Sequence, residues 1–152
     1  MPLREIASDL FLSTDQCNVY VLRHDDKALV FDRGDGSVLG EIETIGVKHV
    51  EWGLFTHHHR EQCSGASKFA GSETKLAGPE AERALFETPQ AFRKLRVSLS
   101  DAHTVHGASY VRPPIEAVKL DRGFKHMDVF PWHQHEIWCL ATPGNSPGGM
   151  SY

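Results

Sequence analysis

Three consecutive histidines near the middle of the sequence are the residues whose type and spacing could most clearly do chemistry. Residues two apart on an extended backbone project to the same side, so His57 and His59 can converge on one cation while His58 points elsewhere. Neutral imidazole is a preferred ligand of zinc and similar metals. Two ligands are fewer than the three or four of a protein zinc site, so a histidine-rich surface loop is the alternative interpretation.

Other histidines and one cysteine are weaker candidates. His133 and His135 also alternate, but they lie between two strand-like stretches, where a solvated hairpin turn is favoured over a pair of ligands. His103 and His106 lie in a stretch without periodicity, so their spacing would suit one helical face only if a helix formed there. Cys63 follows the histidines, and a small buried side chain at a helix start is favoured over a thiolate ligand.

The elements that must position the histidines are a strand before them and a helix after them. Apolar residues from 50 to 56 predict a buried strand that runs directly into the histidines. Predicted strands occupy residues 10–12, 18–22, 28–31, 50–56, 74–77, 115–120, 129–132 and 136–141. Predicted helices cover residues 38–45, residues 64–70 and a stretch that starts at Pro79.

This order of elements predicts an α+β fold, in which a sheet with an antiparallel opening carries helices on one face. The last predicted strand ends almost at Tyr152, which would leave an unpaired sheet edge. We therefore expect either a missing C-terminal segment or a second copy of the chain, as in a homo-oligomer, to cover that edge. With 152 residues, the chain has the length of one domain, residues 1–152.

Composition excludes several classes of function. The 16 basic and 20 acidic residues give a net charge of −4 without a long run of either sign, so no nucleic acid and no membrane surface are expected as partners. No apolar run approaches the ~20 residues of a membrane span. The N-terminus has no signal-peptide pattern, and three distant cysteines are not a disulfide framework. Both features predict a cytoplasmic protein.

Three separated motifs resemble those of the metallo-β-lactamase superfamily. Asp32 lies in the segment Val-Phe-Asp-Arg-Gly, His57 and His59 form a His-x-His loop, and Thr-Pro-Gly-Asn-Ser-Pro-Gly occupies residues 142–148. Their order and approximate spacing match the first half to two-thirds of that fold. The resemblance implies an αβ/βα sandwich, incomplete at its C-terminal end, with metals at one edge of the packed sheets.

The same resemblance implies the ligands. The family's loop usually reads His-x-His-x-Asp-His, so His57 and His59 match ligands of the first metal, Glu61 replaces the aspartate and Gln62 replaces a histidine. Asn145 stands where the family usually carries a third histidine and can offer an amide oxygen. The resulting predicted set is His57, His59, Glu61 and Asn145. We expect it to hold one ion rather than two, zinc first, with iron or manganese as alternatives.

The resemblance also implies catalytic roles for two carboxylates. Asp32 matches a position that supports the metal loop from behind, which is an orienting role. Glu61 would bind a second metal or, where that site is empty, accept a hydrogen bond from the attacking water as a base. A bound divalent cation lowers the pKa of its water to about 7 and polarises the substrate oxygen.

The sequence therefore predicts a metal-dependent hydrolase of a small-molecule ester, thioester, amide or phosphoester. A fold alone does not define the substrate. The alternative is a degenerate, non-catalytic domain used for binding or assembly, which Gln62 and Asn145 favour. The retention of His57, His59 and Glu61 argues against that alternative, and a redox member of the family using iron would need more ligands than the chain offers.

Overall fold

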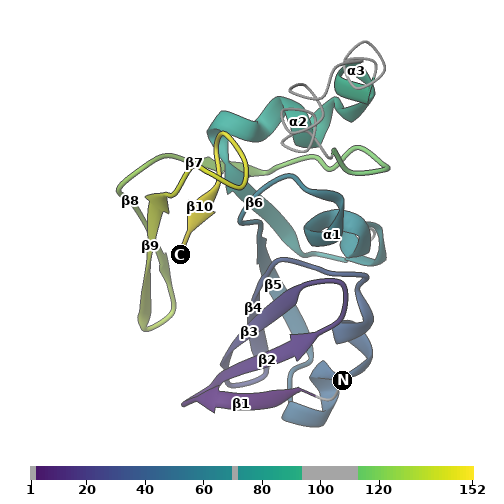
Figure 1. Ribbon diagram of the computed structural model, residues 1–152. Helices are drawn as coiled ribbons and strands as arrows, with labels where there is room; N and C mark the ends of the chain where they lie inside the picture. Colours follow the sequence, from purple (N-terminus) through teal and green to yellow (C-terminus); the bar gives the residue numbers. More distant parts are fainter. Residues whose placement is uncertain (1–2, 70–71, 94–112) are drawn as a thin grey trace.

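Seven strands form the larger of two sheets in the computed structural model, which describes residues 3–69, 72–93 and 113–152 (Figure 1). The first four strands pair antiparallel and the remaining three continue the sheet in parallel. In spatial order they are β1 (Arg4–Ala7), β2 (Leu10–Thr14), β3 (Asn18–His24), β4 (Lys27–Phe31), β5 (His49–Leu54), β6 (Lys75–Pro79) and β7 (Arg122–Phe124). Tight turns suffice for the antiparallel pairs, whereas each parallel pair needs a longer crossover.

Short helices lie in these crossovers. They are η1 (Ser37–Gly40), η2 (Ile42–Ile45), α1 (Arg60–Cys63), η3 (Ser64–Phe69), η4 (Glu80–Glu82), α2 (Arg83–Glu87) and α3 (Pro89–Arg93). The helix predicted over residues 38–45 is two 3₁₀ turns that end before Gly46. Pro79 closes β6 instead of opening a helix, so the helical stretch begins at Glu80.

A smaller antiparallel sheet packs on one face of the larger one. It contains β8 (Asp128–Trp132), β9 (His135–Ala141) and β10 (Met150–Ser151), in the order β10-β9-β8. Along β9, Ile137 and Cys139 are buried between the sheets while Trp138 and Leu140 face outward. This alternation is the period-2 pattern of a strand with one covered face.

The opposite face of the larger sheet is covered by the 3₁₀ helices. Val38 and Ile42 from these helices pack with Ala28 and Val30 of β4, while Leu29 of the same strand faces the smaller sheet. Because both faces are covered, β4 carries an unbroken apolar run instead of an alternating one. The sequence-based prediction of an α+β sandwich is confirmed by this helix–sheet–sheet arrangement.

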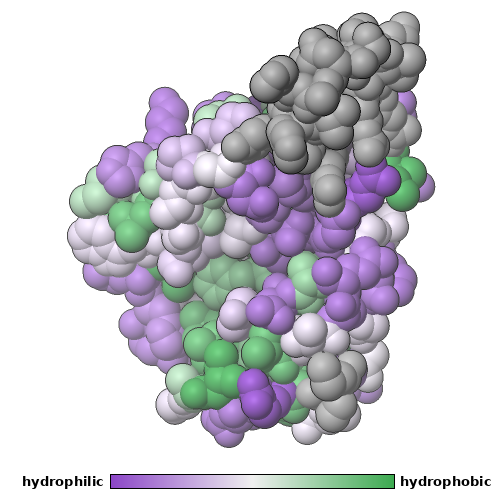
Figure 2. Space-filling model, in the orientation of Figure 1, coloured by the Kyte–Doolittle hydropathy of each residue, from purple (hydrophilic) through white to green (hydrophobic). Residues whose placement is uncertain are grey.

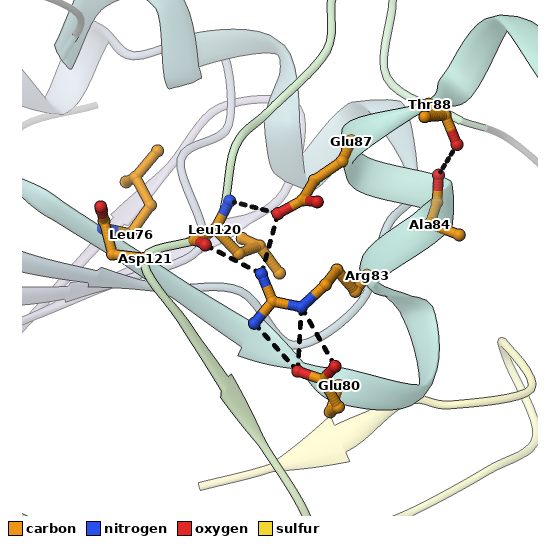
Figure 3. A network of polar contacts seen from close by, with 8 residues as sticks. All are labelled: Leu76, Glu80, Arg83, Ala84, Glu87, Thr88, Leu120 and Asp121. Carbon is orange, nitrogen blue, oxygen red and sulfur yellow. Dashed lines mark hydrogen bonds and ion pairs between the residues drawn. The ribbon is translucent and has the colours of Figure 1, made fainter.

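The strand predicted over residues 115–120 is wrong. That segment has no sheet partner, and Arg83 fastens it to α2 through a hydrogen bond of 2.9 Å to the Leu120 carbonyl and ion pairs with Glu80 and Glu87 (Figure 3). The Glu87 carboxylate accepts the Leu120 N–H at 3.1 Å. Side chains of a helix thus satisfy backbone groups that a strand would have paired with a neighbour. The short strands β1, β7 and β10 were not predicted.

Apolar side chains also gather on the surface. Figure 2 shows them over β1 and β2, while the helical region above is largely hydrophilic. β1 is exposed along its length, and its Ile6 is 43% exposed. In the three described ranges no helix is long and apolar enough to cross a membrane.

Candidate metal site

The predicted site residues come from three segments that meet at one edge of the sheets. Asp32 follows β4, and the histidine loop, residues 56–59, follows β5. β4 and β5 are parallel neighbours, so their carboxyl ends lie side by side. The proline-glycine loop, residues 142–149, connects β9 to β10, and a hydrogen bond of 2.9 Å from the Met150 N–H to the Thr56 carbonyl joins it to the histidine loop.

A chain of hydrogen bonds links Asp32 to His57 through Thr56. Asp32 is 7% exposed; its Oδ1 accepts the Thr56 N–H at 2.9 Å and its Oδ2 accepts the Thr56 hydroxyl at 2.8 Å. The same hydroxyl oxygen lies 2.8 Å from His57 Nδ1. The single hydroxyl proton of Thr56 goes to Asp32, so the proton between Thr56 and His57 must be on Nδ1. His57 Nε2 is therefore unprotonated and carries a lone pair that can act as an acceptor.

Burial determines the protonation states of His57 and Asp32. Burial and the neighbouring His59 lower the pKa of His57 to about 4, so at neutral pH the ring is in the uncharged form that binds a metal. Burial raises the pKa of Asp32 to about 7, against the two hydrogen bonds from Thr56, which lower it. Asp32 also has a left-handed backbone with φ 58°, which turns the chain out of β4.

The unprotonated Nε2 of His57 faces the proline-glycine loop, where it accepts a hydrogen bond from Nδ2 of Asn145 at 3.0 Å. The ring of His59 lies edge-on to the His57 ring with centroids 4.5 Å apart. The structure therefore brings together His57, His59 and Asn145. Glu61 lies in the first turn of α1, partly buried, where its charge acts on His57 and raises its pKa slightly.

His58 bonds to Glu82, a partner that the sequence did not predict, and its ring lies edge-on to the His59 ring with centroids 4.9 Å apart. Its side chain is fully buried, and its Nδ1 lies 2.7 Å from Oε2 of Glu82, which is 1% exposed. Glu82 stands at the end of η4, 24 residues from His58. A glutamate that follows Pro79-Glu80 reads as part of a solvated helix start, so no signal in the sequence pointed to this contact.

The weaker candidate ligands lie apart from this edge or are not in a form that binds a metal. His133 occupies the β8–β9 turn, where its Nε2 lies 2.8 Å from Glu51 and its ring stacks on His24 at 4.2 Å. Cys63 is 2% exposed, and burial raises the pKa of its thiol well above the ordinary value, so it is not a thiolate at neutral pH. His103 and His106 lie outside the described residues.

The donor set fits a single divalent ion in its chemistry. Considering only the residues that the structure describes, no group of three or more His, Cys, Asp or Glu could hold a metal ion. The set therefore consists of two imidazoles, of which the neutral His57 is oriented by Thr56, and the Asn145 amide, whose oxygen would face His57 after a 180° turn. Three protein ligands are the number that catalytic zinc sites use.

Comparison with known proteins identifies the class. The chain matches the model of the metallo-β-lactamase superfamily over residues 12–152, and it belongs to that superfamily. Its members are typically metal-dependent hydrolases. A search of curated proteins found no match.

Solved structures of metallo-β-lactamases share the fold. BJP-1, a subclass B3 enzyme of Bradyrhizobium japonicum, superposes with a TM-score of 0.76 at 20% identity, over 99% of this chain and 55% of that chain. A Cronobacter sakazakii metallo-β-lactamase described by its HARLDQ motif gives 0.74 at 17% identity, over 99% and 58%. MIM-1 from Novosphingobium pentaromativorans gives 0.75 at 18% identity, over 98% and 54%. The chain thus spans a little more than half the length of these structures.

Proposed function

We propose that this chain forms the metal-binding part of a metal-dependent hydrolase acting on a small-molecule ester, thioester, amide or phosphoester. The observation that carries the proposal is the hydrogen-bonded chain Asp32–Thr56–His57, which presents the Nε2 lone pair of His57 beside His59 and Asn145. A protein usually fixes the tautomer and orientation of a histidine ligand by a hydrogen bond from its other ring nitrogen to a nearby oxygen acceptor.

The chain's own residues would act as follows. His57, His59 and the amide oxygen of Asn145 would hold one ion, zinc first, with iron or manganese as alternatives. When bound, such an ion supplies an activated water and polarises the substrate oxygen. Asp32 would keep His57 in the correct tautomer, and Glu61 would accept a proton from the attacking water.

The glutamine in the histidine loop is compatible with this proposal. Residues 57–62 read HHHREQ, and the motif HARLDQ of the Cronobacter sakazakii enzyme ends in the same residue. A solved metallo-β-lactamase therefore carries glutamine in the place where Gln62 replaces the family's histidine. The third residue of that motif is arginine where this chain has His59, so the likeness supports only that glutamine at position 62 is compatible with the fold.

A non-catalytic domain is the second candidate. Asn145 contributes an amide where the family usually has an imidazole, and among the described residues no group of three His, Cys, Asp or Glu is placed to hold a metal ion. A weakened ligand set of this kind would lower metal affinity. The sandwich would then serve binding or assembly.

The outer face of the smaller sheet supports a partner. Trp138 and Leu140 of β9 are 47% and 40% exposed, and Met127 is 54% exposed. We propose that a further segment of the same sandwich covers this face, since the solved relatives are nearly twice as long. A concentration-dependent dimer in light scattering, abolished by Trp138→Glu, would instead identify a second copy as the cover.

Metal content tests the hydrolase proposal. The protein would be purified without chelator or histidine tag and measured by plasma mass spectrometry, beside a His57→Ala/His59→Ala double variant. We expect about one ion per chain in the wild type, as for a mononuclear catalytic site, and none in the variant. Metal near zero in both proteins after incubation with excess zinc would contradict the proposal and favour the non-catalytic domain.

A further inference from the structure

The histidine loop and the proline-glycine loop meet on one buried carboxylate. We infer that Glu82 is a positioning residue that holds these two loops, and with them His57, His59 and Asn145, in fixed relation to each other. The catalytic meaning of this inference rests on the proposed function, whereas the coupling of the loops does not.

Both oxygens of Glu82 are used, one for each loop. Oε2 accepts the backbone N–H of His58 at 2.8 Å and its ring Nδ1–H at 2.7 Å. Oε1 accepts the backbone N–H of Gly148 at 2.9 Å. The partners are 24 and 66 residues away in the sequence, so one side chain of the β6–α2 connection ties together two otherwise distant segments.

Three converging N–H donors require a carboxylate. An amide at this position would offer one oxygen and would turn its own N–H groups toward the other donors. Burial alone would raise the pKa of Glu82, but contacts with His58, with the Ser146 hydroxyl and with the Gly148 N–H lower it to about 2. The side chain is therefore an acceptor on both oxygens throughout the physiological range.

The hydrogen bonds from His58 to Glu82 constrain the positions of His57 and His59. His58 stands between His57 and His59, and its backbone N–H and its ring are both held on the Glu82 side. The His59 ring lies edge-on to the His58 ring, with centroids 4.9 Å apart, and edge-on to the His57 ring, with centroids 4.5 Å apart, so holding His58 also constrains where these two imidazoles lie.

The proline-glycine loop lies directly on Glu82. A Cβ on Gly148 would come within 2.7 Å of Glu82 Cγ, so only glycine permits this approach. The loop is braced internally by hydrogen bonds of 2.8 Å from Thr142 N–H to the Gly149 carbonyl and 3.1 Å from Gly144 N–H to the Ser146 carbonyl. Fixing Gly148 therefore also fixes Asn145, three residues earlier.

Glu82 has a firm base for this role. The residue immediately after it, Arg83, pairs with Glu80 and Glu87 and donates to the Leu120 carbonyl, which fixes the start of α2 (Figure 3). Glu80 is a matched control, because it lies in the same η4 turn and carries the same carboxylate but contacts neither loop through any hydrogen bond described. When Glu80 becomes glutamine, Arg83 keeps its ion pair with Glu87 and its hydrogen bond to the Leu120 carbonyl, so the start of α2 stays fixed.

The test compares Glu82→Gln with Glu80→Gln. In metal-free protein, amide hydrogen exchange by NMR should show that Glu82→Gln loses protection at the His58 or the Gly148 amide by at least about tenfold, since glutamine keeps one oxygen and the other amide loses its acceptor. In a Co²⁺ titration followed by visible absorption, the same variant should bind about 10–100-fold more weakly, the usual effect of removing an outer-shell partner. Glu80→Gln should change neither readout.

Glu82→Gln leaves buried His58 with a mismatched partner and can fail to fold. A second variant therefore tests the same inference without changing Glu82. Gly148→Ala retains the Glu82–His58 pair but forces the proline-glycine loop away from it. It should weaken Co²⁺ binding and leave the His58 amide protected. Unchanged exchange at both His58 and Gly148 in folded Glu82→Gln, or Co²⁺ affinity within about twofold of wild type in both variants, would overturn the inference. A wild type that binds no Co²⁺ would refute the proposed function alone, because the exchange experiment still tests the loop coupling.

Discussion

Thr56→Val removes the hydroxyl that connects Asp32 to His57 and leaves the shape of the side chain nearly unchanged. Two contacts disappear, namely the 2.8 Å donation to Asp32 Oδ2 and the 2.8 Å acceptance from His57 Nδ1. The backbone hydrogen bond from Thr56 N–H to Asp32 Oδ1 remains. The variant therefore isolates the hydroxyl's share of the support behind the histidine loop.

The size of the effect follows from these contacts. A hydrogen bond to a charged group contributes about 1.5–3 kcal/mol and a neutral one about 0.5–1.5 kcal/mol. Because Asp32 is buried and its Oδ2 loses its hydroxyl donor, we expect a loss of about 2–3 kcal/mol in the free energy of unfolding. For a chain of this length this corresponds to a fall in Tm of roughly 5–10 °C.

The loss of unfolding free energy in Thr56→Val should be larger at high pH than at low pH. The folded-state pKa of Asp32, about 7, lies above its unfolded value, so folded protein binds this proton more tightly and stability falls as pH rises toward 7. The Thr56 hydroxyl lowers that pKa, so its removal raises the pKa further and extends the decline to higher pH. Thr56→Val should therefore be more destabilising at pH 8 than at pH 5.

Urea unfolding at both pH values gives the stability, and ¹⁵N NMR of the imidazoles gives the tautomer of His57. Thr88→Val is the control, because its hydroxyl donates to the Ala84 carbonyl at 2.8 Å near the end of α2, away from the site (Figure 3). A loss below about 0.5 kcal/mol in Thr56→Val, with an unchanged Nδ1–H tautomer, would refute the reasoning.

Three further predictions address other parts of the molecule. Gly53→Ala should cost about 1–3 kcal/mol in urea unfolding, since its new Cβ would coincide with the guanidinium of fully buried Arg33, whereas Gly40→Ala, with open space around it, should cost far less. Burial raises the pKa of Glu51, but the hydrogen bond from His133 and other contacts give a net lowering. The stability from Glu51 is thus present above its unfolded pKa of about 4.3 and lost in acid, and Glu51→Gln should flatten the unfolding free energy below pH 5. All three cysteines have pKa values raised by burial, so a thiol reagent at pH 8 should react far more slowly with native than with urea-unfolded protein, and equal rates would contradict this.

The strands that sequence patterns predicted correctly are those whose burial leaves a local signature. Residues 28–31 form an apolar run because both faces of β4 are covered, and residues 136–141 alternate because β9 is covered on one face only. Residues 115–120 also contain several apolar side chains, but only Val118 and Leu120 are buried, and their backbone groups bond to Phe86 and Arg83 of α2. The partner of a segment, and not its apolar content alone, decides whether it is a strand.

The site could be predicted only as far as its residues have a recognisable spacing. His57 and His59 are found by the period of a strand, and Asp32 and Asn145 by resemblance to a family. Glu82 and the hydroxyl of Thr56 could not be found, because their roles depend on contacts across 24 residues of sequence. Such partners acquire their function only when the parallel strands bring their carboxyl ends together.

The two levels of the site differ in how complete they are. Among the ligand positions that the family resemblance implies, Gln62 and Asn145 are replacements, whereas behind the histidine loop both oxygens of Asp32 and of Glu82 accept hydrogen bonds. A buried carboxylate left without donors would cost several kcal/mol, so these supports are needed for folding as well as for ligand geometry. Loss of metal affinity therefore need not disturb the loops. Conversely, Asn145→His offers the proline-glycine loop an imidazole on a support that is already in place, and a gain in Zn²⁺ affinity in that variant, measured by calorimetry, would show that the geometry for a third ligand has been retained. No gain, with the variant folded and His57 in the same tautomer, would show that Asn145 is set too far from the ion for its identity to matter.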